Sequence, residues 1–186
     1  MRKLAILAFL ITFLVPPAFA GDTDKEKSED PKQETPKQKK DVEWFKYDEG
    51  LKLAKEKNLH VLVNFTTSWC GWCKRMNKTT FKEPEVVKLM NNSFVSVKVD
   101  AESKNELNID GYKITERNLA LTEFGARSYP TYWFLKPDGQ KLGQLQGYQQ
   151  ADIFIDVLYF MKENLYDKMT FEEYMKAGGK KGFSKS

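Results

Sequence analysis

The chain has 186 residues, of which 41% are hydrophobic and 30% are charged, and its formal net charge is +4. This length suits one compact domain once the two termini are set aside. Basic residues are interleaved with acidic ones, and no stripe of Lys and Arg alternates with aromatic residues. The charge pattern expected of a nucleic-acid-binding protein is therefore missing, and nucleic acid is excluded as an expected partner.

The first 20 residues have the features of a cleavable secretory signal. Met1-Arg2-Lys3 is basic, residues 4–15 are apolar apart from Thr12, and Ala18-Phe19-Ala20 resembles a small-residue cleavage site. The apolar run is shorter than the roughly 20 residues that span a bilayer. We therefore expect a signal peptide at 1–20 and a periplasmic or secreted protein.

The rest of the chain divides by composition. Residues 21–41 contain no aromatic and no branched aliphatic residue, which predicts a disordered charged linker. We expect the folded domain at 42–168. The last segment, 169–186, contains Gly178-Gly179 and Lys180-Lys181 and is expected to be a loose C-terminal tail.

The first elements of the expected domain form a βαβ unit. Apolar residues recur at helical spacing over 44–57. Residues 60–66 are a short, apolar, β-branched run, which is typical of a buried central strand. A helix is expected over 71–90, interrupted at Pro84, and a second strand over 94–99.

The second half is expected to close a mixed sheet. Residues 131–135 and 141–146 flank Pro137-Asp138-Gly139, a strong turn signal that predicts an antiparallel hairpin. The other expected elements are a polar loop, a short helix and a closing helix, in that order at 101–115, 116–124 and 153–165. The fold class is therefore α/β, with a central mixed β-sheet flanked by helices on both faces.

The chemistry of the chain is concentrated in Trp69-Cys70-Gly71-Trp72-Cys73-Lys74. In a C-x-x-C pair at the start of a helix, the free N–H groups and the positive end of the helix dipole favour the thiolate at the first cysteine. We therefore expect Cys70 to attack a substrate disulfide and Cys73 to resolve the mixed disulfide. The motif predicts thiol-disulfide exchange without its direction.

Other interpretations of the cysteine pair have less support. A zinc site needs four ligands, and the chain offers only His60 in addition, so no metal site is expected. An inert structural disulfide is the other alternative. His60 is interpreted as a strand-edge residue, because no nucleophile motif surrounds it.

The sequence resembles the thioredoxin superfamily. Residues 61–65 lead into the C-G-W-C motif, and Tyr129-Pro130-Thr131 precedes the hairpin, as in thioredoxin. The sequence is also similar to exported thioredoxin-like proteins that are related to the C-terminal domain of bacterial membrane thiol:disulfide interchange proteins. The residues that carry this similarity are Gly50, Ala54-Lys55, Met76, Thr80-Phe81 and Glu85-Val86-Val87. The resemblance covers about 44–165 and implies a thioredoxin-like fold.

The resemblance also implies a substrate-binding set. Pro130 would be cis and face the cysteine pair, Tyr129 would contact bound peptide, and Trp69 would shield the active site beside Trp72. Gly147 resembles a family glycine near the substrate groove. Simple packing roles are the alternative for Trp69 and Gly147.

Two residues depart from the thioredoxin pattern. Asn64 stands where thioredoxin usually carries a buried aspartate that helps to move the proton of the resolving cysteine, and an amide cannot titrate. Deprotonation of Cys73 must therefore use water or another group. Trp72 replaces the proline of thioredoxin and the histidine common in oxidising relatives, so it argues for neither extreme of redox role.

The sequence thus predicts an exported thiol-disulfide oxidoreductase that serves cell redox homeostasis. Of the two directions of exchange, reduction of substrate disulfides is favoured. It would need no cofactor besides the redox-active Cys70–Cys73 disulfide. The expected partners are protein thiols and disulfides and a membrane electron donor of the disulfide interchange type, with the chain itself a monomer. A disulfide oxidase or isomerase and a redox-regulated peptide-binding or chaperone module are the alternatives.

Overall fold

The computed structural model describes residues 40–183. The expected signal peptide and nearly all of the expected linker lie outside the described residues. Seven strands are present within this range: β1 Trp44–Phe45, β2 His60–Thr66, β3 Phe94–Asp100, β4 Glu106–Ile109, β5 Tyr112–Thr115, β6 Thr131–Leu135 and β7 Lys141–Gln146. The helices are α1 Tyr47–Lys57, α2 Gly71–Lys78, α3 Pro84–Ser93, α4 Glu116–Asn118, α5 Ala151–Lys162, α6 Phe171–Lys176 and α7 Gly179–Phe183.

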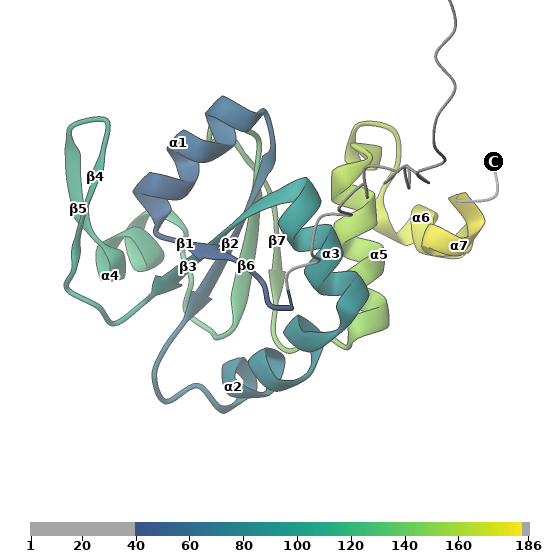
Figure 1. Cartoon of the computed structure of the whole chain (residues 1–186), viewed down its shortest axis with the longest axis horizontal. Coiled ribbons are helices and arrows are strands. Elements are labelled where there is room, and N and C mark those ends of the chain that lie inside the picture. Colours follow the sequence, from purple (N-terminus) through teal and green to yellow (C-terminus); the bar gives the residue numbers. More distant parts are fainter. Residues whose placement is uncertain (1–39, 184–186) are drawn as a thin grey trace, which may run out of the picture. The chain divides into compact units, whose positions relative to one another are not determined.

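Five strands form one mixed sheet in the order β1-β3-β2-β6-β7 (Figure 1). β1, β3 and β2 are parallel, whereas β6 is antiparallel to β2 and β7 is antiparallel to β6. The βαβ unit and the hairpin expected from the sequence are therefore both present, and the α/β class is confirmed. β2 lies at the centre because its residues Val61 to Phe65 are all buried.

Helices cover both faces of this sheet. Alternate residues of β2 enter two separate apolar clusters: Leu62 packs with residues of α3 and α5, whereas Val61 and Val63 pack with residues of α1. This follows from the period of two in a strand, which sends successive side chains to opposite faces. Figure 1 shows α3 and α5 on one side of the sheet and α1 with α4 on the other.

The helical segment after the cysteines is divided at the residue that the sequence indicated. α2 ends at Lys78, a single 3₁₀ turn occupies Thr80–Lys82, and α3 begins with Pro84 as its first residue. Proline fits this position because its missing N–H would have no partner in the first helical turn. The break separates a short helix that carries the cysteines from a longer one that packs on the sheet.

Three expectations differ from the structure. Residues 101–115 are not only loop, because β4 and β5 pair as a hairpin with Leu107 and Ile114 buried on one side. Their turn at Asp110-Gly111 has positive φ at both residues, a geometry that glycine and aspartate tolerate. Trp44–Phe45 is a short strand, so α1 begins only at Tyr47.

The third difference concerns the C-terminal tail, which is folded as far as Phe183. Tyr174 of α6 is fully buried and packs on Phe160 with ring centroids 5.3 Å apart. Its hydroxyl donates to Asp156 of α5, at 3.2 Å. A capping box between Thr170 and Glu173 begins α6. The two glycines and two lysines suggested a loose tail, but burial of one aromatic side chain and a well-capped helix hold it against α5.

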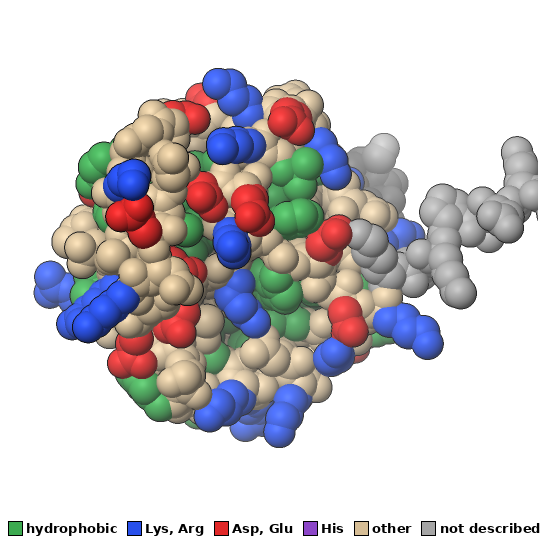
Figure 2. Space-filling view, turned by 60° about the vertical axis from the view of Figure 1, so that its left-hand side comes forward, with side chains coloured by type: hydrophobic (Ala, Val, Ile, Leu, Met, Phe, Trp, Pro, Cys, Tyr) green, Lys and Arg blue, Asp and Glu red, His purple; other side chains and the backbone are tan. Residues whose placement is uncertain are grey.

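The surface carries mixed charges. On the face shown in Figure 2, Lys and Arg side chains are interleaved with Asp and Glu. Within residues 40–183, no helix is long and apolar enough to cross a membrane.

Candidate active site

Cys70 and Cys73 lie where the chain passes from β2 into α2. Cys70 is the N-cap residue of α2 and Cys73 lies one turn further on, with Cα atoms 5.3 Å apart and the two sulfurs joined in a disulfide of 2.00 Å. Each cysteine is only 3% exposed. The start of α2, shortly after the end of β2, therefore positions both sulfurs.

The local electrostatics favour a thiolate at Cys70. The Cys73 N–H donates a hydrogen bond to Cys70 Sγ at 3.0 Å. This contact comes from the first turn of α2, where N–H groups are free and the helix dipole is positive. The same N–H and the helix dipole are features that favour a thiolate over a thiol at a helix start, in agreement with the expectation that Cys70 is the attacking cysteine.

A second segment lies at the end of β2 that leads to the cysteines. The Tyr129–Pro130 peptide bond is cis and immediately precedes β6, whose first residue, Thr131, pairs with Phe65 near the end of β2. The Gly147 N–H donates to the Pro130 carbonyl at 2.8 Å. Gly147 has a φ of +80°, a backbone conformation that favours glycine. The expected Tyr129, Pro130 and Gly147 thus lie together, on the sheet edge that carries the disulfide.

Exposed aromatic rings flank the disulfide on two sides. Trp69 is 63% exposed, and its ring meets that of Tyr129 edge-to-face at 6.0 Å. Trp72 is 55% exposed and stacks obliquely on Tyr148, with ring centroids 5.6 Å apart. Large exposed aromatic rings beside a buried disulfide are characteristic of a surface that binds other molecules.

Below the site, the sheet carries a row of polar side chains without a carboxylate. Asn64 pairs in register with Lys98 of β3 and Tyr132 of β6, so the three side chains share one sheet face. Leu62, two residues before Asn64, packs with Met76 of α2 on this face. The row therefore faces the helix that carries Cys73.

Two polar atoms of this row are buried without a hydrogen-bond partner. Within residues 40–183, the buried Asn64 Oδ1 and Tyr132 hydroxyl have no hydrogen-bond partner. Burial raises the pKa of Tyr132 far above its usual range and lowers the pKa of Lys98. Of the three groups, Lys98 is therefore the one that burial brings toward a neutral, proton-accepting form.

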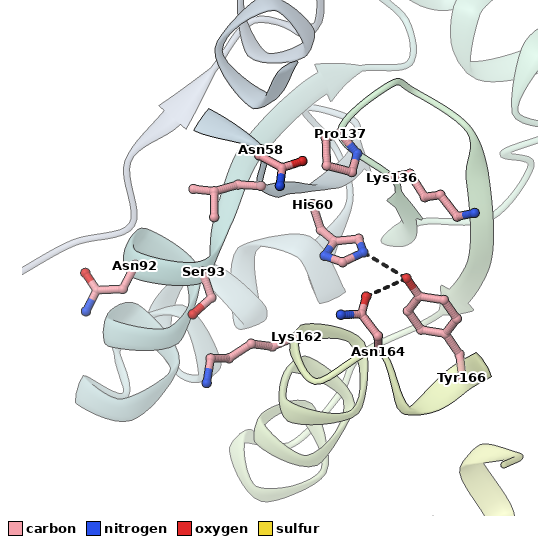
Figure 3. Close-up of a pocket in the computed structure, with 10 residues that line it drawn as sticks. Asn58, His60, Asn92, Ser93, Lys136, Pro137, Lys162, Asn164 and Tyr166 are labelled. Carbon is pink, nitrogen blue, oxygen red and sulfur yellow. Dashed lines mark hydrogen bonds between the residues drawn. The ribbon is translucent and has the colours of Figure 1, made fainter. Parts of the chain in front are cut away.

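A separate cleft of about 510 Å³ lies at the other end of β2 (Figure 3). It contains His60, whose Nε2 lies 3.0 Å from the Tyr166 hydroxyl, and that hydroxyl donates to Asn164 Oδ1 at 2.7 Å. Because the single hydroxyl hydrogen of Tyr166 is used in this bond, the hydrogen between His60 and Tyr166 must be carried by His60 Nε2. Burial, followed by the nearby Lys136 charge, lowers the pKa of His60. No cysteine lines this cleft, so it takes no part in the thiol chemistry.

Sequence reasoning missed two residues that the structure adds to the site, Tyr148 and Arg75. Arg75 lies over the rings of both Trp72 and Tyr148, with distances of 5.5 and 5.0 Å from its guanidinium carbon to the ring centroids. Arg75 follows Trp72 by three residues in α2, a spacing that places both on one helix face. That spacing was visible in the sequence, whereas the approach of Tyr148 was not.

The geometry defines the class of site. A cysteine pair at a helix N-terminus, with a cis proline segment and exposed aromatic rings beside it, has the make-up of a thiol-disulfide oxidoreductase site. Within the described range, no three His, Cys, Asp or Glu side chains are grouped so as to hold a metal ion.

Comparison with known proteins places the chain in a family. The model of the thioredoxin-like domain matches residues 47–162, and the chain therefore belongs to the thioredoxin-like family. A thioredoxin from Thermus thermophilus is 26% identical with a TM-score of 0.54, over 65% of this chain and 87% of that one. A thioredoxin-fold protein from Helicobacter pylori has a TM-score of 0.59 at 20% identity, over 70% of this chain and 88% of that one.

Curated relatives extend the comparison. The thiol:disulfide interchange protein DsbD of Campylobacter jejuni is 28% identical over 92 residues, which is 50% of this chain and 14% of DsbD. An uncharacterized Caenorhabditis elegans protein, B0495.5, is 28% identical over 98 residues, which is 52% of this chain and 13% of that protein. The chain thus spans a small part of the curated relatives that it matches.

Proposed function

We propose that this chain is an exported thiol-disulfide oxidoreductase that exchanges disulfides with protein substrates. The observation that carries the proposal is the Cys70–Cys73 disulfide at the N-terminus of α2, beside the cis Tyr129–Pro130 segment and the exposed rings of Trp69 and Trp72. Buried sulfurs next to exposed aromatic surface suit a reaction in which a bound chain is brought to a preformed nucleophile.

In the reducing direction, the Cys70 thiolate attacks one sulfur of a substrate disulfide. A Cys70–substrate disulfide forms and the second substrate sulfur leaves as a thiolate, which takes up a proton. Cys73 then loses its proton and attacks Cys70 Sγ, which releases the first substrate sulfur. Two electrons and two protons pass from the dithiol to the substrate, and the Cys70–Cys73 disulfide remains.

The second step needs a group that accepts the proton of Cys73. Asn64 cannot do so, but two titratable residues, Lys98 and Tyr132, pair in register with it. Burial raises the pKa of Tyr132 and lowers the pKa of Lys98, so Lys98 suits a proton acceptor better. We assign this role to Lys98. Because its ammonium lies over the Trp44 ring, at 5.1 Å from the ring centroid, water would carry the proton from Cys73.

The direction of electron flow is proposed to be reducing, with electrons supplied by a membrane donor. Similarity to a part of DsbD, which is named as a thiol:disulfide interchange protein, supports the exchange reaction, and the reduction potential is the test of its direction. The basic and apolar start of the chain supports export to the periplasm or to the medium. Mass spectrometry of the protein recovered from an exporting bacterial host should find Gly21 as the first residue, and retention of Met1 would contradict cleavage.

The reduction potential tests the direction. The mature protein would be equilibrated in dithiothreitol or glutathione buffers, and the fluorescence of Trp69 and Trp72 would report the state of the disulfide. A potential near about −270 mV, the thioredoxin value, is the expected result. A value near about −120 mV, that of the oxidant DsbA, would make the protein a disulfide donor. The Cys70→Ser variant is the control, because its fluorescence should not respond to the buffer.

A redox-regulated peptide-binding module is the second candidate, favoured by the same exposed rings. The variant with both cysteines replaced by serine separates the two functions. An enzyme loses turnover and its role in the cell together, whereas a binding module keeps its client.

A further inference from the structure

The surface beside the disulfide carries a charged side chain that the exchange chemistry does not use. Arg75 is exposed and lies over two aromatic rings, at 5.5 Å from Trp72 and 5.0 Å from Tyr148. Within residues 40–183, no carboxylate lies within 4 Å of its guanidinium nitrogens. Arg75 also forms a side-chain hydrogen bond with Tyr148. Neither a ring face nor a neutral hydroxyl neutralises the guanidinium charge, so the remaining N–H groups of Arg75 are available to an anion.

The position of Tyr148 under Arg75 is fixed by contacts with α2 and the turn after it. The Tyr148 hydroxyl lies 3.3 Å from Thr79 Oγ1, which itself donates to the Arg75 carbonyl at 2.9 Å. Thr80 Oγ1 donates to the carbonyl of Gln149 at 2.6 Å. The shelf of Trp72, Tyr148 and Arg75 is thus built from two separate segments that are tied together, rather than from one mobile side chain.

The shelf is connected to both the cysteine pair and the Tyr129–Pro130 segment. Tyr148 directly follows Gly147, whose N–H binds the Pro130 carbonyl, and Trp72 directly precedes Cys73. A chain bound against the Tyr129–Pro130 segment with its disulfide at Cys70 therefore passes close to Arg75.

The charges near the two exposed tryptophans differ. α2, which carries Trp72, contains Lys74, Arg75 and Lys78 and no acidic residue. Near Tyr129, beside Trp69, the carboxylates of Glu102 and Asp100 are accompanied by the guanidinium of Arg117. The side of Trp72 is therefore positive, whereas the side of Tyr129 carries mixed charge.

We propose that the shelf of Trp72, Tyr148 and Arg75 is a specificity subsite that selects protein substrates with an acidic side chain on one side of the reacting cysteine. This inference rests on the proposed function and names its substrate class. The apolar part of the substrate residue lies on the rings, and its carboxylate accepts hydrogen bonds from Arg75. An exposed charge pair of this kind changes a rate or an equilibrium by up to about fivefold, and repulsion of a lysine adds to the difference.

Single-turnover kinetics with short peptides test the subsite. Each peptide carries one cysteine as a mixed disulfide with 5-thio-2-nitrobenzoate, and Asp, Asn or Lys stands before or after that cysteine. The pre-reduced protein attacks the peptide sulfur, nitrobenzoate thiolate leaves and is followed by its absorbance, and Cys73 then frees the peptide thiol. Each rate constant is divided by that of dithiothreitol with the same peptide, which removes the intrinsic reactivity of the disulfide.

The wild-type protein should react about fivefold or more faster with the Asp peptide than with the Lys peptide, on one side of the cysteine. Arg75→Gln should lower this ratio at least threefold. Lys88→Gln is the matched control, since it removes an exposed charge from α3 and should leave the ratio unchanged. The preference should also shrink in 1 M salt, where the screening length falls to about 3 Å.

Two further variants separate the ring from the hydroxyl. Tyr148→Phe keeps the surface under Arg75 and should keep the preference, whereas Tyr148→Ala should lose most of it. An equal Asp-to-Lys ratio in the wild type and in Arg75→Gln would overturn the subsite. Reduction of hydroxyethyl disulfide, which carries no charge, separates the subsite from the proposed function. If the wild type fails to reduce it, the proposed function fails as well. If reduction proceeds without any peptide preference, only the subsite fails.

Discussion

Replacing Asn64 by aspartate should make the stability of the protein strongly dependent on pH. Asn64 is 2% exposed and its Oδ1 has no partner among the described residues, so a carboxylate there would be buried without a hydrogen-bond donor. Burial of this degree raises a carboxyl pKa by about 3 pH units or more. Each unit corresponds to about 1.4 kcal/mol, which gives a loss of about 4 kcal/mol of unfolding free energy at pH 7.5.

The sign follows from proton binding. Between the pKa of the unfolded carboxyl and that of the folded one, the folded state of the variant holds a proton that the unfolded state has lost. Stability therefore falls as pH rises through this window, and at pH 4 the loss relative to wild type should be below about 1 kcal/mol. Urea denaturation at pH 4 and pH 7.5, followed by tryptophan fluorescence, measures both values.

A matched variant isolates the effect of burial. Asn118→Asp makes the same change at an exposed position in α4 and should alter stability by less than about 0.5 kcal/mol at either pH. The reasoning would be refuted if Asn64→Asp cost the same at pH 4 and pH 7.5. That result would mean that the site admits water, or that the ammonium of Lys98, its neighbour in register, compensates the carboxylate.

Two other predictions concern stability. Gly50→Ala should destabilise the fold by about 1–3 kcal/mol in urea denaturation, because the added Cβ would lie 2.3 Å from Val97 Cγ2 of β3. This loss is expected although alanine favours helices more than glycine does. An unchanged midpoint would show that β3 can shift. Burial, with a smaller contribution from Glu123, raises the pKa of Tyr47 to about 12. Between pH 10 and 12 the unfolded state therefore loses the tyrosine proton first, and stability falls. The unfolding free energy of Tyr47→Phe should therefore rise by about 1.4 kcal/mol relative to that of wild type between pH 9 and pH 11. Parallel pH profiles of the two proteins would contradict this.

Local patterns in the sequence predicted the elements that form the frame of the site. The short apolar run before the cysteines is a buried strand, because a segment of that composition and length pairs best between two others. Pro84 begins α3, as its missing N–H allows. The C-G-W-C motif indicated the disulfide because a one-turn spacing at a helix start brings two sulfurs together.

Weak local signals were overridden by packing. The hairpin β4–β5 is mostly polar, and only Leu107 and Ile114 mark its buried side. Likewise, the composition of residues 169–186 suggested a tail, but one fully buried tyrosine holds α6 against α5. In both segments a few apolar contacts from distant parts of the chain decide the outcome, and no local pattern records them.

The sequence by itself thus determined the chemistry of this protein, since the identity and spacing of Cys70 and Cys73 are local properties that a single helical turn converts into a reactive pair. Only the tertiary structure decided what surrounds the pair. The contact of Arg75 and Trp72 with Tyr148 joins residues more than 70 positions apart, and the isolation of Asn64 depends on strands on both of its sides. Such contacts depend on the packing of whole elements, because a side chain's neighbours across a sheet are set by register and not by its own sequence context.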